Sequence, residues 1–327
     1  MYFRTTGELE KKNVHFNSLP DYFKNLIVDY RKELTARHLN QRTIVNYLCS
    51  ISKFLKFLHS INAGDISKIG IEIINTFLIS TYNELNQYGR KCTIGTLLLH
   101  IAALRGFFTL LELKEIVPYN IARKITPPIQ EERLPRGILS KQEISLLLQQ
   151  PDVATVRGLQ ARAVLEMLYG CGLRNSELRR LTVNDIDLTA RILTVRLGKG
   201  QKDRKLPIGN SALHWLERYL KLRNTLSPTT PFLFLARGEK APLTNGGLIF
   251  IIHYYKSLAG INKKVVPHTL RHCFATHLLE EGAPLPAISA LLGHNSLEAT
   301  QIYTRVGIES LKKIHEKYHP REKFKLC

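Results

Sequence analysis

The sequence lacks the features that mark membrane and secreted proteins. No uninterrupted apolar run approaches the roughly 18 residues that a membrane-spanning helix needs, and the chain does not open with a signal-peptide pattern. The five cysteines are odd in number and far apart, with neither the pairing of a disulfide framework nor the spacing of a zinc site. We therefore expect a soluble, cytoplasmic protein with reduced thiols at Cys49, Cys92, Cys171, Cys273 and Cys327.

Acidic side chains are scarce relative to basic ones. The chain has 27 Asp and Glu residues against 47 Lys and Arg residues, which gives a formal net charge of +20. A field of this sign favours a polyanionic partner, and nucleic acid is the leading candidate. Residues 1–132 carry 17 basic and 12 acidic side chains, whereas residues 133–327 carry 30 and 15. We therefore expect the stronger electrostatic hold on such a partner in the second part of the chain.

Strand-like patterns are rare in the first third of the chain. From about residue 20 to residue 113, apolar side chains recur at three- and four-residue steps, which predicts a bundle of about four helices. The segment from residue 125 to 137 contains three prolines among charged residues and cannot continue a helix. We predict a helical domain at residues 18–115, a linker at 116–137 and a second domain at 138–327. One apolar series expected to face the core of the first domain consists of Ile44, Tyr47, Leu48, Ile51, Phe54, Leu55 and Leu58.

The second domain is predicted to be mainly helical with one small β element. Ser140, followed three residues later by Glu143, has the pattern of a capping box at the start of a helix. Residues 191–208 contain two short strand patterns around a glycine-rich basic turn, which predicts a β-hairpin. The predicted fold class is mainly α: a helical N-terminal domain followed by a mixed α+β domain.

Several short motifs that carry reactive or phosphate-binding side chains follow one another along the second domain. Arg174 follows Gly172-Leu173, Lys199 lies in the hairpin turn, and His268 and Arg271 form a His-x-x-Arg pair. His294 follows a glycine, and Tyr303 comes nine residues after it. In this order and spacing the motifs resemble those of the tyrosine recombinase, or phage integrase, family, especially its Xer-type members. The resemblance covers residues 134–318 and, more loosely, the preceding helices, which are similar to the family's core-binding DNA-binding domain.

The resemblance implies a site-specific DNA recombinase that cleaves and rejoins strands through a 3′-phosphotyrosine intermediate, without a metal or any other cofactor. Tyr303 would be the nucleophile, and conserving the bond energy in its ester would remove the need for ATP. Planar, permanently charged guanidinium groups suit a phosphate clamp, and histidine can bond phosphate or move a proton near neutral pH. The implied catalytic residues are Arg174, Lys199, His268, Arg271, His294 and Tyr303.

Some residue roles stay open at this stage. The general acid that protonates the departing 5′ oxygen is expected to be Lys199, with Lys202 as the alternative; Lys202, Arg204 and Lys205 are otherwise expected to hold backbone phosphates. Glu177 either orients Arg174 across one helical turn or forms a simple surface pair with it.

The alternative to a phosphate-binding role for His268 is a metal site with two further histidines of the same predicted helix. No carboxylate or cysteine completes an obvious ligand set there, and the spacing differs from that of an HExxH helix. We therefore expect no metal, and structural roles for His272 and His277.

The resemblance also implies the partners. Two basic domains would close on opposite faces of double-stranded DNA, and residues 308–318 are similar to the family's C-terminal helix, which packs into a neighbouring protomer. A homo-tetramer, or a tetramer with a paralogous recombinase, is expected on two paired sites. Integration, excision, resolution and transposition, including movement of a mobile element, are equally compatible with the sequence. The alternative functions are a nicking-closing enzyme like a type IB topoisomerase and a non-catalytic DNA-binding regulator.

Overall fold

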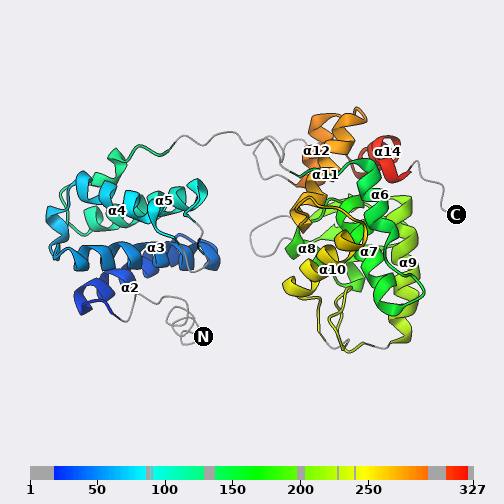
Figure 1. Cartoon of the computed structure of the whole chain (residues 1–327), viewed down its shortest axis with the longest axis horizontal. Helices are drawn as coiled ribbons and strands as arrows, with labels where there is room; N and C mark the ends of the chain where they lie inside the picture. Colours follow the sequence, from blue (N-terminus) through cyan, green and yellow to red (C-terminus); the bar gives the residue numbers. More distant parts are fainter. Residues whose placement is uncertain are drawn as a thin grey trace. The chain divides into compact units, whose positions relative to one another are not determined.

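The computed structural model describes residues 18–85, 89, 91–128, 137–196, 203–226, 228–238, 241–293 and 307–322. By its internal contacts the chain divides into two compact units, unit 1 at Met1–Glu132 and unit 2 at Arg133–Cys327 (Figure 1). Each unit has its own hydrophobic core.

Unit 1 is a helical bundle, as the spacing of its apolar residues predicts. Helix α3 packs against both α2 and α5, and the predicted apolar series of α3 lies in the core, where Phe54 meets the rings of Phe77 and Phe108. Tyr47 of that series is only half-buried. The elements are α2 (Asp21–Ala36), α3 (Gln41–Ser60), η1 (Ile66–Lys68), α4 (Ile71–Asn83), α5 (Ile94–Leu113) and η2 (Ile121–Lys124).

Helix α5 is the most apolar helix of unit 1. By length and composition alone it is suited to cross a membrane. In this structure it is a core helix, because its buried side chains include Leu104, Phe107, Phe108 and Leu111 and it packs on α2, α3 and α4. Its one arginine, Arg105, donates to the carbonyl of Ile125 and so connects the end of unit 1 to this helix.

Unit 2 is built around α7, which is buried on nearly every side and packs against α9 and α11. Before it, the capping box at Ser140 forms as predicted: the Ser140 hydroxyl accepts from the amide of Glu143, and the Glu143 carboxylate accepts from the amide of Ser140. The helices are α6 (Lys141–Gln149), α7 (Val156–Gly170), α8 (Asn175–Arg180), η3 (Val183–Asp185), α9 (Asn210–Thr225), α10 (Asn245–Leu258), α11 (Pro267–Glu280), α12 (Leu285–Leu292), α14 (Ile308–Tyr318) and η4 (Pro320–Glu322).

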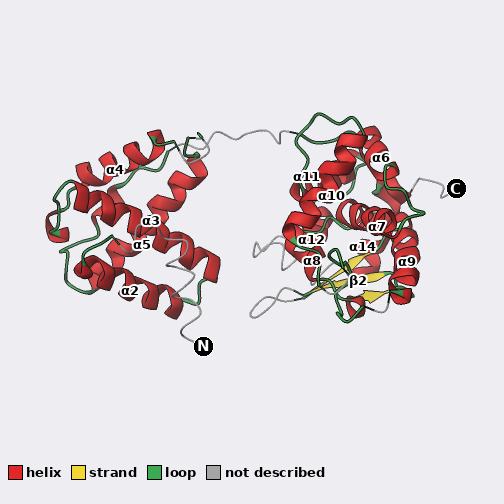
Figure 2. Cartoon of the chain, turned by 60° about the horizontal axis from the view of Figure 1, so that its bottom comes forward, coloured by secondary structure: helices red, strands yellow, loops and turns green. Residues whose placement is uncertain are grey.

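A small antiparallel sheet lies at one side of unit 2 (Figure 2). Its order is β1 (Ile186–Asp187), β2 (Ile192–Val195) and β3 (Arg204–Pro207), and Val195 pairs with Arg204 where β2 and β3 approach the turn between them. The predicted strands are confirmed, while residues 197–202 of the turn lie outside the described residues. β1 adds a third strand that was not predicted, because two residues are too few for a readable alternation.

The C-terminal helix α14 packs on its own unit. Leu311 joins the core of unit 2, and the Nε2 atom of His315 bonds the carbonyl oxygen of Gly170 at 2.8 Å. The family resemblance implies a helix that packs into a neighbouring protomer. In this single chain, the apolar side of α14 is instead covered by β3 and α12 of the same unit.

Candidate active site

A glycine turn and a short helix position Arg174. Gly172 has a left-handed backbone with φ +59°, and a Cβ atom there would lie 2.6 Å from the ring of Phe274. Only glycine therefore suits this turn between α7 and α8. Arg174 stands at the N-cap of α8, where its amide donates to the Oε2 atom of Glu177 at 2.8 Å. This bond satisfies an amide that the helix itself leaves without a partner.

Three arginines meet at the carboxylate of Glu177, and we call these four residues the Glu177 cluster. Arg204 donates from Nη1 and Nη2 to Oε1 and Oε2 of Glu177, each at 2.8 Å, and Arg174 donates from Nη1 to Oε1 at 2.7 Å. The Nη1 atom of Arg271 lies 3.9 Å from Oε2. Glu177 is buried, so its alternative reading as a simple surface pair with Arg174 is wrong.

The electrostatics of the Glu177 cluster favour an anion. Burial by itself raises the pKa of Glu177, but the hydrogen bonds and charge of Arg204, together with the bonds from Arg174, lower it to about 2. The carboxylate is thus ionised at neutral pH. Three guanidinium groups against one carboxylate leave a surplus of two positive charges. Arg174 carries this charge towards solvent, because 40% of its side chain is exposed.

Arg271 is held from α11 by backbone carbonyls. Its Nη1 atom donates to the carbonyl of Gly172 at 2.8 Å, and its Nη2 atom donates to that of Leu292 at 2.5 Å. Burial and the charge of Arg174 lower the pKa of Arg271 to about 10, while Glu177 raises it. The guanidinium therefore stays charged at neutral pH.

The end of α12 is bound by both predicted phosphate-binding arginines. Arg174 donates from Nη2 to the carbonyl of Gly293 at 3.0 Å, and Arg271 donates to that of Leu292, the preceding residue. The structure thus brings Arg174 and Arg271 together beside the residue that precedes His294 in the sequence. Three predicted catalytic residues, Lys199, His294 and Tyr303, lie outside the described residues.

The histidines of α11 divide into exposed and buried ones. His268 and His272 are exposed, with ring centroids 4.3 Å apart, and His268 lies one turn before Arg271. His277 is buried; its Nδ1 atom meets the hydroxyl of Tyr169 and its Nε2 atom meets the carbonyl of Leu139, each at 2.9 Å. Both ring nitrogens of His277 are thus engaged in the core, which fits the structural role expected for it and leaves it unable to share a metal with the other two.

Arg204 was expected to hold a backbone phosphate, and this prediction is wrong. Only 4% of its side chain is exposed, and both of its terminal nitrogens bond Glu177. The sequence does contain a signal for this position. On β3, Arg204 and Leu206 are buried while Lys205 is exposed, so the alternation of a strand places Arg204 on the inner side.

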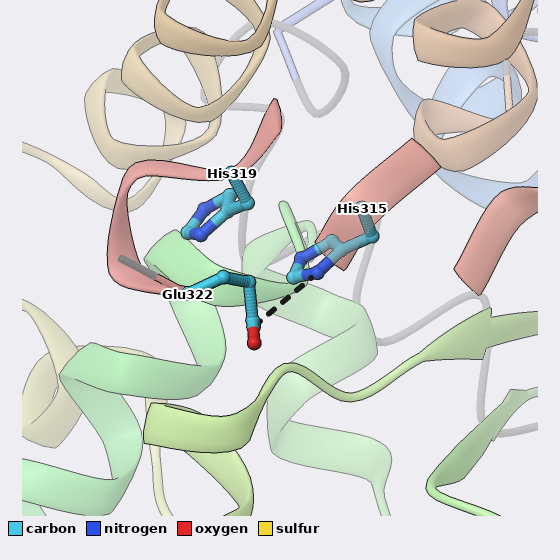
Figure 3. A group of neighbouring side chains, drawn as sticks. All are labelled: His315, His319 and Glu322. Atoms are coloured by element: carbon cyan, nitrogen blue, oxygen red, sulfur yellow. Dashed lines mark ion pairs between the residues drawn. The ribbon is translucent and has the colours of Figure 1, made fainter. Parts of the chain in front are cut away.

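Three titratable side chains near the C-terminus also gather in the core of unit 2: His315, His319 and Glu322, with their ligand atoms within 4.8 Å of one another (Figure 3). The Nδ1 atom of His315 lies 3.5 Å from the Oε1 atom of Glu322. Burial lowers the pKa of His315 to about 4, so this contact is no ion pair at neutral pH.

The hydrogen bonds of this group favour a structural role over a metal site. The Nδ1 atom of His319 accepts from the amide of Arg321, which places the ring's own proton on Nε2. The ring then offers no lone pair towards the other two groups. Two remaining ligands fall short of the four that a structural zinc ion takes.

A family model described as the phage integrase family matches residues 138–309. The chain is 41% identical over 278 residues to tyrosine recombinase XerC 2 of Ralstonia nicotianae, covering 83% of this chain and 78% of that protein. It is 40% identical over 290 residues to tyrosine recombinase XerD of Pseudomonas putida, covering 86% and 93%. The chain belongs to the phage integrase family.

Solved structures show the same fold at lower sequence identity. The integrase of the Tn1549 transposon, in complex with circular intermediate DNA, has a TM-score of 0.65 at 19% identity and covers 88% of this chain and 98% of that one. The XerH site-specific recombinase bound to its difH substrate has a TM-score of 0.61 at 22% identity and covers 80% and 76%.

These comparisons confirm the predicted family, fold class and enzymatic function. The protein is a tyrosine recombinase of Xer type, a site-specific DNA recombinase that cleaves and rejoins DNA. The comparisons thereby favour this function over the topoisomerase-like and regulatory alternatives.

Proposed function

We propose that this recombinase cleaves DNA by attack of the Tyr303 phenol oxygen on the scissile phosphorus, with Arg174 and Arg271 holding the non-bridging oxygens. The observation that carries the proposal is the convergence of these two arginines on Glu177 and on the carbonyls of Leu292 and Gly293. Guanidinium groups fixed in advance, where charge develops, stabilise the transition state without reorganising during the reaction.

The remaining residues complete the reaction. As the bond from phosphorus to the Tyr303 oxygen forms, the bond to the 5′ oxygen of the next nucleotide breaks, and Lys199 donates a proton to that oxygen. His268 and His294 bond the phosphate and take the proton that the phenol loses. Rejoining reverses these steps, with a 5′ hydroxyl attacking the phosphotyrosine. The bond energy stays in the ester, so the reaction requires neither ATP nor a metal.

The partner of the site is double-stranded DNA. Support comes from the net charge of +20 and from the fold shared with recombinases that were solved on DNA. We assign residues 18–115 to a core-binding DNA-binding domain, 116–137 to a linker and 138–327 to the catalytic domain. The active assembly is a homo-tetramer, or a tetramer with a paralogous recombinase, on two paired sites in the cytoplasm.

The nucleophile is tested with Tyr303→Phe. The substrate is a duplex recovered from a random-sequence pool by repeated capture on the wild-type protein, then nicked beside the mapped cleavage point so that the covalent adduct accumulates. On a denaturing gel, wild type is expected to give a shifted protein–DNA band and the Phe variant none, with DNA affinity retained. A band of normal intensity from Tyr303→Phe excludes Tyr303 as the nucleophile.

A further inference from the structure

Arg204 is placed to act on the active site without reaching DNA. Its side chain is buried, and its two terminal nitrogens are bonded to the two oxygens of one carboxylate. Its Nε atom is also buried and has no hydrogen-bond partner in the described part of the chain. The charge of Arg204 is thus paired with a carboxylate, whereas the terminal nitrogens of the equally buried Arg271 bond neutral backbone carbonyls.

Arg204 fixes the orientation of the carboxylate on which Arg174 depends. The backbone amide of Arg174 bonds one oxygen of Glu177, and the two parallel bonds from Arg204 then fix the plane of the carboxylate, which the single bond from the long Arg174 side chain does not. Arg174 and Arg204 share the same oxygen, Oε1. A rotation of the carboxylate would therefore displace the guanidinium of Arg174 directly.

Two neighbouring elements hold Arg204 in turn. In the sheet it pairs with Val195 of β2, so its backbone cannot shift independently of the strand. On the other side, a Cβ atom at Gly293 would lie 2.7 Å from Cδ and 2.8 Å from Nε of Arg204. The backbone of Gly293 thus lies against the Arg204 side chain, while its carbonyl accepts from Arg174.

We infer that Arg204 is a positioning residue of the recombination reaction: through the shared carboxylate of Glu177 it holds Arg174 in the geometry that grips the scissile phosphate. This inference rests on the proposed function, in which Arg174 binds a non-bridging oxygen. It assigns to strand β3 a part in phosphate recognition that does not require contact with DNA.

The test compares Arg204→Met, which keeps an unbranched apolar stem and removes the charge, with Arg204→Lys, which keeps the charge and removes the two-pronged contact. Single-turnover cleavage of the nicked duplex is expected to slow by about 10²-fold in Arg204→Met, the effect of displacing a reacting group by about 1 Å. DNA affinity should stay within about threefold of wild type, because the charge of Arg204 is already paired with Glu177 and neutralises no phosphate. Arg204→Lys should be intermediate, since an ammonium group cannot form both bonds in one plane.

A substrate with a methylphosphonate at the cleaved position separates positioning from general damage. A neutral methyl group replaces one charged non-bridging oxygen, so the reaction depends less on the arginines that neutralise it. If Arg204 acts through Arg174, the deficit of Arg204→Met should shrink to below about tenfold on this substrate, as should the deficit of Arg174→Ala. Equal slowing of Arg204→Met on both substrates, or no slowing on either, overturns the inference.

Two outcomes distinguish a failure of the proposed role of Arg174 from a failure of the role inferred for Arg204. If Arg174→Ala shows no recovery on methylphosphonate, the proposed role of Arg174 fails, whatever Arg204 does. If Arg174→Ala recovers and the Arg204 variants do not, only the present inference fails. Arg196→Met serves as a control, because Arg196 directly follows β2 and pairs with a different buried carboxylate, that of Asp185, at 2.6 Å; it should cleave normally. If Arg204→Met does not fold, Arg204→Lys supplies the same comparison between substrates.

Discussion

The two units bury different kinds of polar side chain. Among the described residues, unit 1 buries uncharged groups only: Ser50, Ser52, Thr81, Asn120 and His100, whose pKa burial lowers to about 4. Unit 2 buries charged groups as well, namely Arg162, Glu166, Glu177, Asp185, Arg204, Arg223, Arg271 and Arg321. Unit 1 is thus held by apolar packing, while the core of unit 2 also contains fixed charges.

The function of unit 2 explains its buried charges better than a gain in stability does. A buried ion pair contributes little net stability compared with apolar side chains of similar volume, because both charges must leave water. What a buried pair does provide is a charge whose position is set by several contacts. In unit 2 one such group lies around Glu177, and another joins Glu166 of α7 to Arg321 near the C-terminus at 2.6 Å. The first of these orients the residues that we propose to act on phosphate.

The largest effect is expected from Glu177→Ala. The variant leaves three guanidinium groups around an empty position, and removing one partner of a buried pair typically costs about 3–5 kcal/mol of unfolding free energy. Arg174 and Arg271 also lose their common partner, so cleavage should fall by about 10²–10³-fold even at saturating DNA. Urea unfolding followed by the fluorescence of Trp215, the sole tryptophan and a residue of unit 2, gives the first quantity. Covalent adduct formation gives the second.

Two controls separate stability from chemistry in this comparison. Asp185→Asn weakens another buried carboxylate of unit 2, the partner of Arg196, and should lower stability while leaving the rate at saturating DNA near that of wild type. Phe54→Ala in the core of unit 1 should cost about 3–5 kcal/mol through the cavity it opens, again with normal chemistry. A slow chemical step in both controls would show that cleavage follows stability and not the Glu177 cluster.

Unit 1 could be predicted well from the sequence because its core is apolar. Its helices are amphipathic, and the spacing of residues such as Leu48, Ile51 and Phe54 identifies the buried side of α3 directly. The hairpin and the capping box of unit 2 were predictable for a similar reason, since each depends on residues close in sequence. β1 was not, because its pairing with β2 involves only two residues.

The sequence nominated residues for the candidate site but could not predict the contacts between them. The spacing of the motifs singled out Arg174 and Arg271, yet these residues are almost a hundred positions apart, and nothing local indicates that one carboxylate serves both. The contact of Arg204 with Glu177 bridges 27 positions and depends on how β3 packs against α8. Basic residues near a turn are commonly exposed phosphate contacts, and this general tendency led to the wrong role for Arg204.

The buried histidines predict a smaller, pH-dependent difference between the units. Burial lowers the pKa of His315 from 6.5 to about 4, so its contribution to stability is complete above pH 6.5 and is lost as the pH falls through 4. Burial raises the pKa of Glu322 to about 6. Its contribution to stability is therefore present below pH 4.5 and is lost as the pH rises through 6. When the pH falls from 7 to 5, His315 should lower the free energy of unfolding by about 2 kcal/mol, and Glu322 should raise it by about 1 kcal/mol.

Burial and the charge of His315 lower the pKa of His319 as well. His319 therefore adds to the stability that unit 2 loses at low pH. Among the described residues of unit 1, His100 is the one comparable group. Urea unfolding followed by Trp215 should therefore show a lower midpoint at pH 5 than at pH 7, and His315→Gln, which keeps a donor for the Gly170 carbonyl, should reduce the difference. An equal or higher midpoint for wild type at pH 5 contradicts this account of the buried histidines.

The smallest effect is expected from removing metal ions. His315, His319 and Glu322 are the one group of possible ligands that the described residues bring together, and the amide of Arg321 already bonds the Nδ1 atom of His319. Cleavage needs no metal in the proposed mechanism, because the arginines supply the positive charge and Tyr303 the nucleophile. EDTA should therefore change neither the rate of adduct formation nor the unfolding midpoint reported by Trp215. The decisive contrary result is a higher unfolding midpoint when zinc is added back to the wild type, with no such rise in His319→Gln. It would show that the His319 ring turns and binds metal. The buried polar groups of unit 2 would then include a metal site as well as fixed charges.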